Sequence, residues 1–293
     1  MKSYKNMKSI SLCIWLCLSI ISIAATGKDK KQTIRVMSFN IRMDTDKDGL
    51  NRWSNRKDYA CDMIRFHHPD LIGAQEVLHH QLQDICQRLP EYEAVGVGRE
   101  DGKEKGEYSA VFFRKDRFCL LGQQTFWLSE NPEAIGKKSW DAACERVVTW
   151  VKLQDKKSKK IFYFFNTHFD HVGQVARRES CKLLKSKIRE IAGDAPVIVS
   201  GDFNSSPASG VILALTDTTT SDYLIDSRSV AAFRYGPEFS FHDYGKLAPE
   251  RRTILDYIFV KHTGRVLQSA ILTDTRGELF VSDHYPLLSV IEL

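Results

Sequence analysis

APVIVSGDFN, at residues 195–204, is an apolar run that ends in a carboxylate and an amide. Three other runs also carry amide or carboxylate side chains at or near their ends: TIRVMSFNI (33–41), DLIGAQE (70–76) and ELFVSDHYP (278–286). Each run is typical of a buried strand, and polar side chains at the tips of core strands can converge on one hard cation. Magnesium prefers oxygen ligands, usually takes one or two protein carboxylates, and leaves room for phosphate and water. The four runs therefore predict metal-assisted phosphoester hydrolysis.

Two further segments, NTHFD (166–170) and LDYI (255–258), complete a set of six motifs. In this order, and within or at the ends of hydrophobic runs, the motifs resemble the endonuclease/exonuclease/phosphatase superfamily. This superfamily includes DNase I-like nucleases, inositol-phosphate phosphatases and neutral sphingomyelinases. The resemblance runs from about Thr33 to the C-terminus. It implies an α/β (α+β) fold: a four-layer α/β sandwich of two packed mixed β-sheets flanked by helices, with the active site where the strand ends of the two sheets meet.

The N-terminus has the pattern of a targeting segment. Lys2, Lys5 and Lys8 precede an apolar stretch that ends in small residues suited to cleavage. We therefore expect residues 1–25 to be a signal peptide and residues 28–293 to form one endonuclease/exonuclease/phosphatase domain. The protein is then expected to be exported, either periplasmic or secreted. An uncleaved membrane anchor and a lipoprotein are the alternatives.

The charge of the chain limits its partners. Three leader lysines account for part of the formal net charge of +5, which leaves about +2 for the rest of the chain. A protein that binds long nucleic acids should show a clear excess of basic over acidic residues. The sequence therefore lacks the strong basic excess of a nucleic-acid-binding protein, although a nuclease is not excluded. No obligate protein partner is evident from the sequence.

Hydrophobic periodicity predicts alternating strands and helices followed by a β-rich stretch. Ser54 is expected to cap the first helix. The expected helices are 54–67, 79–88 and 172–191. The expected strands are 33–41, 70–76, 92–97, 108–114, 118–127, 146–154, 161–168, 196–200, 255–260, 266–272 and 287–291.

Glu76 is the first expected metal ligand. An isolated ionised carboxylate at the end of an apolar strand is costly to bury, and a cation supplies the missing partner. An exposed glutamate at a strand end is the alternative. The family resemblance adds Asn40 as a neutral oxygen ligand or phosphate-orienting residue. It places Asp283 toward the metal or water side, and Asp283 is the third expected metal ligand. The expected cofactor is Mg2+, with Mn2+ as a possible substitute.

Two pairs of residues are expected to handle water and protons. Asp202 and Asn204 alternate along a segment that, if extended, places both on one face. The resemblance implies that this pair positions the attacking water and stabilises the phosphorus centre, and an Asx-rich turn is the alternative. His284 is the expected general base, because histidine titrates near neutrality. The resemblance assigns Asp256 to its other ring nitrogen.

Phosphate binding is expected of His168, which the resemblance also makes a candidate to protonate the leaving oxygen. Glu107 is the candidate to orient it. The fork of Arg146 suits a phosphate oxygen, and a surface arginine at a strand start is the alternative. Aromatic and amide loops are expected to border the pocket, namely residues 51–53, 124–127 and 239–242.

Together these features predict an exported Mg2+-dependent phosphoester hydrolase that uses metal-activated water and a histidine general base. It is expected to be a phosphodiesterase/nuclease or a phosphatase, and its substrate a nucleic acid, a nucleotide, a sugar or inositol phosphate, or a phospholipid headgroup. A sphingomyelinase-like phospholipase is one alternative, disfavoured because no apolar loop is evident. A catalytically silent binding domain on the same fold is another. The latter is disfavoured because the expected ligand and base residues are present.

Overall fold

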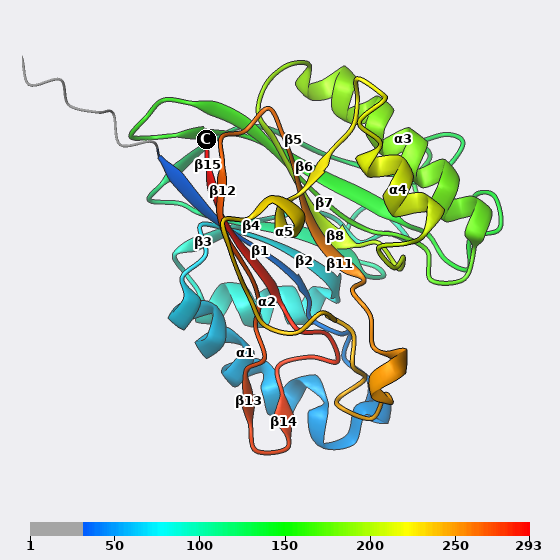
Figure 1. The fold of residues 1–293 in the computed structure, drawn as a ribbon. Helices are drawn as coiled ribbons and strands as arrows, with labels where there is room; N and C mark the ends of the chain where they lie inside the picture. Colours follow the sequence, from blue (N-terminus) through cyan, green and yellow to red (C-terminus); the bar gives the residue numbers. More distant parts are fainter. Residues whose placement is uncertain (1–31) are drawn as a thin grey trace, which may run out of the picture. The chain divides into compact units, whose positions relative to one another are not determined.

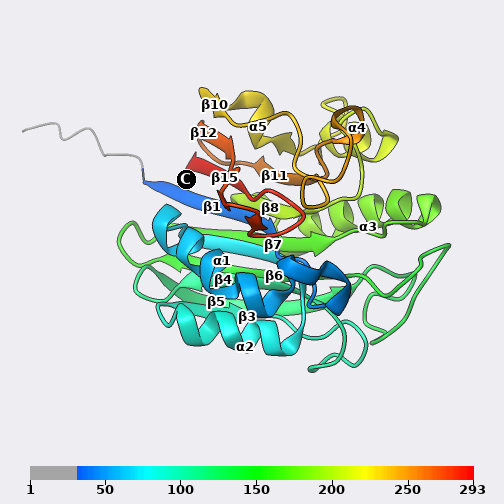
Figure 2. The same cartoon turned by 90° about the horizontal axis from the view of Figure 1, so that it is seen from below.

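Two large β-sheets pack face to face in the computed structural model, which describes residues 32–293 (Figures 1 and 2). The predicted signal peptide lies outside these residues. The seven-stranded sheet has the order β10-β12-β15-β1-β2-β4-β3. Its strands are β10 (Phe233–Tyr235), β12 (Val266–Ile271), β15 (Leu287–Glu292), β1 (Thr33–Asn40), β2 (Leu71–Val77), β4 (Tyr108–Arg114) and β3 (Tyr92–Val95).

The second sheet has six strands in the order β5-β6-β7-β8-β11-β9. These are β5 (Phe118–Trp127), β6 (Val147–Asp155), β7 (Ile161–His168), β8 (Val197–Asp202), β11 (Asp256–Lys261) and β9 (Ile225–Asp226). A separate hairpin joins β13 (Thr275–Arg276) and β14 (Leu279–Phe280).

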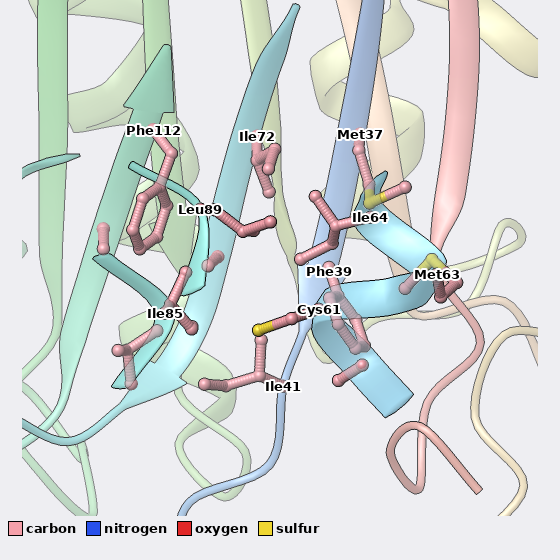
Figure 3. Packing of buried hydrophobic residues seen from close by; sticks show 14 of the residues in the cluster. Met37, Phe39, Ile41, Cys61, Met63, Ile64, Ile72, Ile85, Leu89 and Phe112 are labelled. Atoms are coloured by element: carbon pink, nitrogen blue, oxygen red, sulfur yellow. The ribbon is translucent and has the colours of Figure 1, made fainter. Parts of the chain in front are cut away.

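Helices cover the outer faces of both sheets. They are α1 (Trp53–His67), α2 (His79–Arg88), α3 (Gln174–Ala192) and α4 (Gly210–Thr216). The short helix α5 (Ser227–Val230) instead contacts β11 of one sheet and β12 of the other, and 3-10 turns lie at Asp46–Asn51 and Pro249–Arg251. Helices α1 and α2 pack on the seven-stranded sheet, where Ile64 and Ile85 meet strand residues such as Ile72 (Figure 3). Helices α3 and α4 pack on the six-stranded sheet. Among residues 32–293, no helix is long and apolar enough to cross a membrane.

Strand alternation explains why both sheets are apolar on two faces. In β1, Val36 points between the sheets, whereas Met37 points toward the helices. In β8, Ile198 packs between the sheets and Val199 packs under α3 and α4. Since successive side chains of a strand point to opposite faces, a continuous apolar run builds three apolar layers between four structural layers. The predicted four-layer sandwich is thus confirmed.

Most predicted elements occur close to their expected bounds, and α2, β4, β5 and β7 match them. The run 278–286 is not a buried strand, because within it only Leu279–Phe280 forms a strand, β14 of the separate hairpin. The predicted helix cap is wrong. Helix α1 begins at Trp53, its N-cap is Arg52, and no side chain of the described part of the chain caps it. Short elements after β8, namely α4, β9, α5 and β10, were not expected because their runs are too short to show a period.

A buried polar network joins the two sheets beneath the polar strand ends. Gln75 Nε2 donates to Asn166 Oδ1 at 2.7 Å, and Ser200 Oγ donates to the same oxygen at 3.0 Å. Asn166 Nδ2 donates to the backbone oxygens of Ala74 and Ala110, both at 2.8 Å. The amide of Asn166 is therefore oriented by four partners, and it links the six-stranded sheet to the seven-stranded one.

Gly73 makes this close approach of the sheets possible. A Cβ atom at this position would lie 1.9 Å from Ser200 Oγ and 2.5 Å from Asn166 Oδ1. We expect Gly73→Ala to lower the free energy of unfolding by about 1–3 kcal/mol, as overpacking of a core does. Chemical denaturation measures this loss. Gly210→Ala is the matched control, because a Cβ there meets no atom of residues 32–293 within 4 Å. Equal unfolding free energies for the two variants would contradict the prediction.

Candidate active site

A cleft of about 500 Å³ opens where strand ends of the two sheets meet. Most of the predicted site residues line it: Glu76, Arg146, His168, Asp202, Asn204, Asp283 and His284. Asn40 and Asp256 are not part of the lining. Both are buried behind it and hydrogen-bond to residues that do line the cleft.

Strand register brings the residues of the six-stranded sheet together. In the parallel pair β7–β8, His168 lies opposite Asp202. In the antiparallel pair β8–β11, Asp256 lies opposite the same Asp202. Three neighbouring strands therefore place a histidine and two carboxylates in one row, although 88 positions separate His168 from Asp256 along the chain.

His284 is held by Asp256. Nδ1 of His284 lies 2.8 Å from Asp256 Oδ2, and Nε2 lies 3.8 Å from Asp202 Oδ2. Burial disfavours the charged imidazolium, but the carboxylates of Asp256, Asp202 and Asp283 outweigh burial and raise the pKa of His284 well above its usual value. Asp283 itself accepts a hydrogen bond from Ser282 Oγ and does not pair with the neighbouring ring.

Asp202 lies between the two histidines. Its Oδ2 is 3.5 Å from His168 Nε2 and 3.8 Å from His284 Nε2. Burial and the nearby Asp256 carboxylate raise the pKa of Asp202 to about 7. Asp202 therefore lies within reach of both rings, with a pKa close to neutrality.

The link between Asp202 and Asn204 differs from the expected one. Strand β8 ends at Asp202, and Asn204 has a left-handed backbone with φ of 46°. Asp202 Oδ1 accepts a hydrogen bond from the Asn204 backbone N–H at 2.9 Å. The segment is thus an Asx-type turn and not an extended strand, yet both side chains still line the cleft.

Asn40 also differs from its expected arrangement. Its Nδ2 donates to Glu76 Oε1 and to Asp202 Oδ2, both at 3.0 Å. Its Oδ1 accepts the backbone N–H of Arg42 at 3.0 Å, at a turn where Arg42 has φ of 60°. Asn40 therefore links two carboxylates through its nitrogen, while the oxygen expected of a metal ligand faces the backbone.

Glu76 reaches the cleft through an irregular strand end. The β2–β4 register shifts between Ala74 and Val77, and Glu76 between them has φ of 59°. A left-handed backbone is unfavourable for glutamate and is held only where its surroundings fix it. Burial raises the pKa of Glu76, but hydrogen bonding from Asn40 and the charges of His284 and Arg42 outweigh burial, so the net pKa is lowered and the carboxylate stays ionised.

The donor set fits a hard divalent cation. Glu76, His168 and Asp202 offer ligand atoms that all lie within 4.8 Å of one another. Glu76 is partly buried and Asp283 is buried, and Arg42 approaches their carboxylates only to 3.9 and 3.8 Å. These distances are too long for hydrogen bonds, so both carboxylates can still gain from a cation.

His168 is oriented by Asn204 more closely than by Glu107. Asn204 Nδ2 donates to Phe169 O at 2.9 Å and lies 3.0 Å from His168 Nε2. Because the amide nitrogen faces that ring atom, neutral His168 carries its proton on Nδ1, which lies 4.0 Å from Glu107 Oε2. Burial lowers the pKa of His168 well below its usual value, and Arg146 and Arg99 lower it further. Its Nε2 is therefore an acceptor here, unlike the expected proton donor.

The surroundings of the cleft correct two expectations. Arg146 is 5% exposed, so the surface-arginine alternative is wrong. Of the three loops expected to border the pocket, only 239–242 contributes, through Phe241. Trp53 and Trp127 are buried packing residues instead.

The sequence reasoning missed Arg56, which is fully buried on α1. Its guanidinium donates to the backbone oxygens of Ile41, Arg42 and Val281. It thereby ties the segment after Asn40 to the segment before Asp283. The available signal was an arginine in the apolar helical stripe that includes Trp53 and Ala60.

Comparisons with known proteins agree with this arrangement. A sequence profile described as the Endonuclease/Exonuclease/phosphatase family matches residues 37–284. The structure of an endonuclease/exonuclease/phosphatase from Bacteroides vulgatus is similar, with a TM-score of 0.86, 44% identity, and coverage of 90% of this chain and 100% of that chain. A mannosyl-6-phosphatase from Bacteroides thetaiotaomicron VPI-5482 has a TM-score of 0.82 and 33% identity, over 89% of this chain and 100% of that chain.

Curated relatives are more distant. Nocturnin from Drosophila melanogaster is 25% identical over 213 residues, which cover 66% of this chain and 32% of that protein. The match therefore spans about a third of the length of that relative.

Proposed function

The chain belongs to the endonuclease/exonuclease/phosphatase family, and from this membership we propose that it is a Mg2+-dependent phosphoester hydrolase, with Mn2+ as a substitute ion. That it is exported is proposed from the N-terminal targeting pattern. One observation carries the proposal. Glu76, Asp202 and Asp283 face the same cleft as His168 and as His284, which is paired with Asp256. Buried carboxylates beside an oriented histidine suit metal-assisted attack by water.

Glu76 is the residue that we assign to hold the cation, together with Asp283 and Asp202. The chemistry that a bound divalent cation supplies is polarisation of a phosphoryl oxygen and stabilisation of the leaving oxygen. Asn40 keeps Glu76 and Asp202 together. Positive charge added among these carboxylates also lowers the raised pKa of His284 toward the range in which it accepts protons.

His284 takes a proton from the attacking water, and Asp256 stabilises the imidazolium that forms. The water oxygen bonds to phosphorus as the bond to the leaving oxygen breaks, and the leaving oxygen takes its proton from solvent. Arg146 lines the same cleft with donors that make no hydrogen bond to any described residue, and it is assigned to phosphate binding. His168 and Asn204 also line the cleft, but the Asn204 amide N–H groups are used on Phe169 O and His168 Nε2. No covalent bond between enzyme and phosphate is needed.

The similar mannosyl-6-phosphatase favours the phosphatase branch over the nuclease branch. A catalytically silent domain would be expected to lack a ligand or the base, and this chain retains Glu76 and the His284–Asp256 pair.

We expect the purified protein to hydrolyse phosphoesters when Mg2+ or Mn2+ is present and to stop when EDTA removes the ion. Release of inorganic phosphate and of p-nitrophenol from a panel of mono- and diesters measures this. Zinc-free buffers and re-addition of Mg2+ after EDTA are the controls. Absence of metal-dependent turnover across the whole panel would favour the silent binding domain.

A further inference from the structure

One end of the cleft has buried arginine donors that make no hydrogen bond with the described residues. Arg146 Nη2 bonds His171 Nδ1 at 3.0 Å. Its Nε, which lies 3.6 Å from Asp170 Oδ2, and its Nη1 make no hydrogen bond within residues 32–293. Arg99 Nη1 bonds Glu107 Oε2 at 2.7 Å, and its Nε is likewise unpaired within the described chain. Unpaired buried donors are costly. Both arginines line the cleft, so these donors indicate an anionic ligand at this end.

A small internal void does not account for these donors. It lies beside Arg99, Glu107, Arg146 and His168 and measures about 10 Å³. Such a volume is at the lower limit for one water molecule. One water cannot satisfy three separate guanidinium nitrogens and also face Glu107, so donors remain for a ligand in the main cleft.

A second part of the same cleft is lined by Phe241 and Asp243. The ring of Phe241 lies beside the His284 ring, with centroids 4.8 Å apart. The carboxylate of Asp243 makes no hydrogen bond or ion pair with any residue of the described part of the chain. Its position is nevertheless held, since the backbone N–H groups of His242 and Asp243 both donate to Asp283 O.

The backbone around Asp243 is unusual. Asp243, Tyr244 and Gly245 have φ angles of 48°, 53° and 79°, so three consecutive residues are left-handed. Such a turn is unfavourable for the two non-glycine residues and must be held by its surroundings. Tyr244 helps to stabilise the turn, because its hydroxyl donates a hydrogen bond to Asp48 Oδ2 at 3.0 Å. The turn presents the Asp243 carboxylate to the cleft.

We propose that the cleft selects a phosphomonoester of an uncharged, hydroxylated compound such as a sugar, with Arg146 and Arg99 recognising the phosphoryl dianion and with Phe241 and Asp243 recognising the hydroxylated part. This inference rests on the proposed hydrolase function and names its substrate class. A free carboxylate accepts hydrogen bonds from hydroxyl groups, and an aromatic face packs against the C–H groups between them. The same carboxylate repels a second phosphate, which disfavours a polynucleotide strand.

Three esters test the substrate class with Mg2+ present: mannose 6-phosphate, p-nitrophenyl phosphate and bis(p-nitrophenyl) phosphate. The first two are monoesters, and only the first has hydroxyl groups. We expect kcat/KM to be highest for mannose 6-phosphate and lowest for the diester, with at least about tenfold between them, as one charged hydrogen bond provides. Preference for the diester overturns this inference alone. Hydrolysis of none of the esters overturns the proposed function.

Asp243→Asn tests the recognition of hydroxyl groups. We expect the ratio of kcat/KM for mannose 6-phosphate to that for p-nitrophenyl phosphate to fall about tenfold, mainly through KM, because one charged hydrogen bond is weakened. Asp194→Asn is the matched control, since Asp194 is exposed and lies outside the cleft. An unchanged ratio in Asp243→Asn overturns the assignment.

Arg146→Gln tests the other end of the cleft. Loss of one guanidinium should weaken the binding of a dianionic monoester more than the binding of a monoanionic diester. We therefore expect the monoester-to-diester ratio of kcat/KM, measured with the two p-nitrophenyl esters, to fall by roughly tenfold. Circular dichroism and thermal unfolding establish that the variant is folded. An equal loss of kcat/KM for both esters means that Arg146 does not distinguish a dianionic from a monoanionic phosphoryl group, which overturns its assignment.

Discussion

His284→Ala is expected to lower kcat by about 10²–10⁴-fold, the usual contribution of a positioned acid or base. The variant removes the proton acceptor for the attacking water and leaves the carboxylates of Glu76 and Asp202 in place. Substrate binding should change less than turnover. Steady-state kinetics at saturating Mg2+ separate the two effects. Wild-type turnover in this variant would end the general-base assignment.

Asp256→Asn should damage the same step, because Asp256 hydrogen-bonds to His284 Nδ1. Asparagine keeps the shape of the side chain but no longer stabilises the imidazolium. If both residues act as one unit, the losses in the double variant are less than additive in free energy. His262→Ala is the control, since His262 lies in the turn after β11, outside the cleft. Fully multiplicative losses would assign Asp256 a separate role.

Glu76→Gln is expected to weaken Mg2+ binding by more than the roughly 10–100-fold typical for loss of an outer partner of a metal site. The substitution removes a ligand charge with little change of shape. Titration calorimetry with Mg2+ and Mn2+, together with activity as a function of ion concentration, measures the effect. Full activity at low Mg2+ would show that Glu76 is not a ligand.

The stability of Glu76→Gln has to be measured with the metal absent. Both oxygens of Glu76 accept hydrogen bonds, one from Asn40 Nδ2 and one from the Met43 backbone N–H. Glutamine can satisfy only one of these donors, so some loss of stability is expected without any metal effect. Glu190→Gln, on the exposed face of α3, is the matched control for the chemical change.

Much of the architecture could be predicted because each sheet is covered on both faces. Strands such as β7 and β8 then appear as continuous apolar runs with sharp ends. The polar residues at those ends stand out against the run, which is why His168 and Asp202 could be named. Local sequence also indicated α2, whose apolar residues follow a helical period.

Other features depend on contacts that no local pattern encodes. The direction of the Asn40 amide is decided by the backbone N–H of Arg42 and by the carboxylates of Glu76 and Asp202. The role of Asp243 depends on a left-handed turn in a segment without periodicity. In both cases the sequence gives the residue type, while the tertiary structure decides what that residue faces.

The network around Asn166 has a further consequence, for how the enzyme can be modified. Glu76 belongs to the seven-stranded sheet, and His168 and Asp202 belong to the six-stranded one, so the cleft exists only while the sheets keep one alignment. A substitution in the contact between the sheets around Asn166 and Gly73 can shift that alignment slightly while both sheets remain folded. Such a change would alter turnover without replacing any residue of the cleft. The contact between the sheets is therefore a place where substitutions can adjust activity during evolution or engineering.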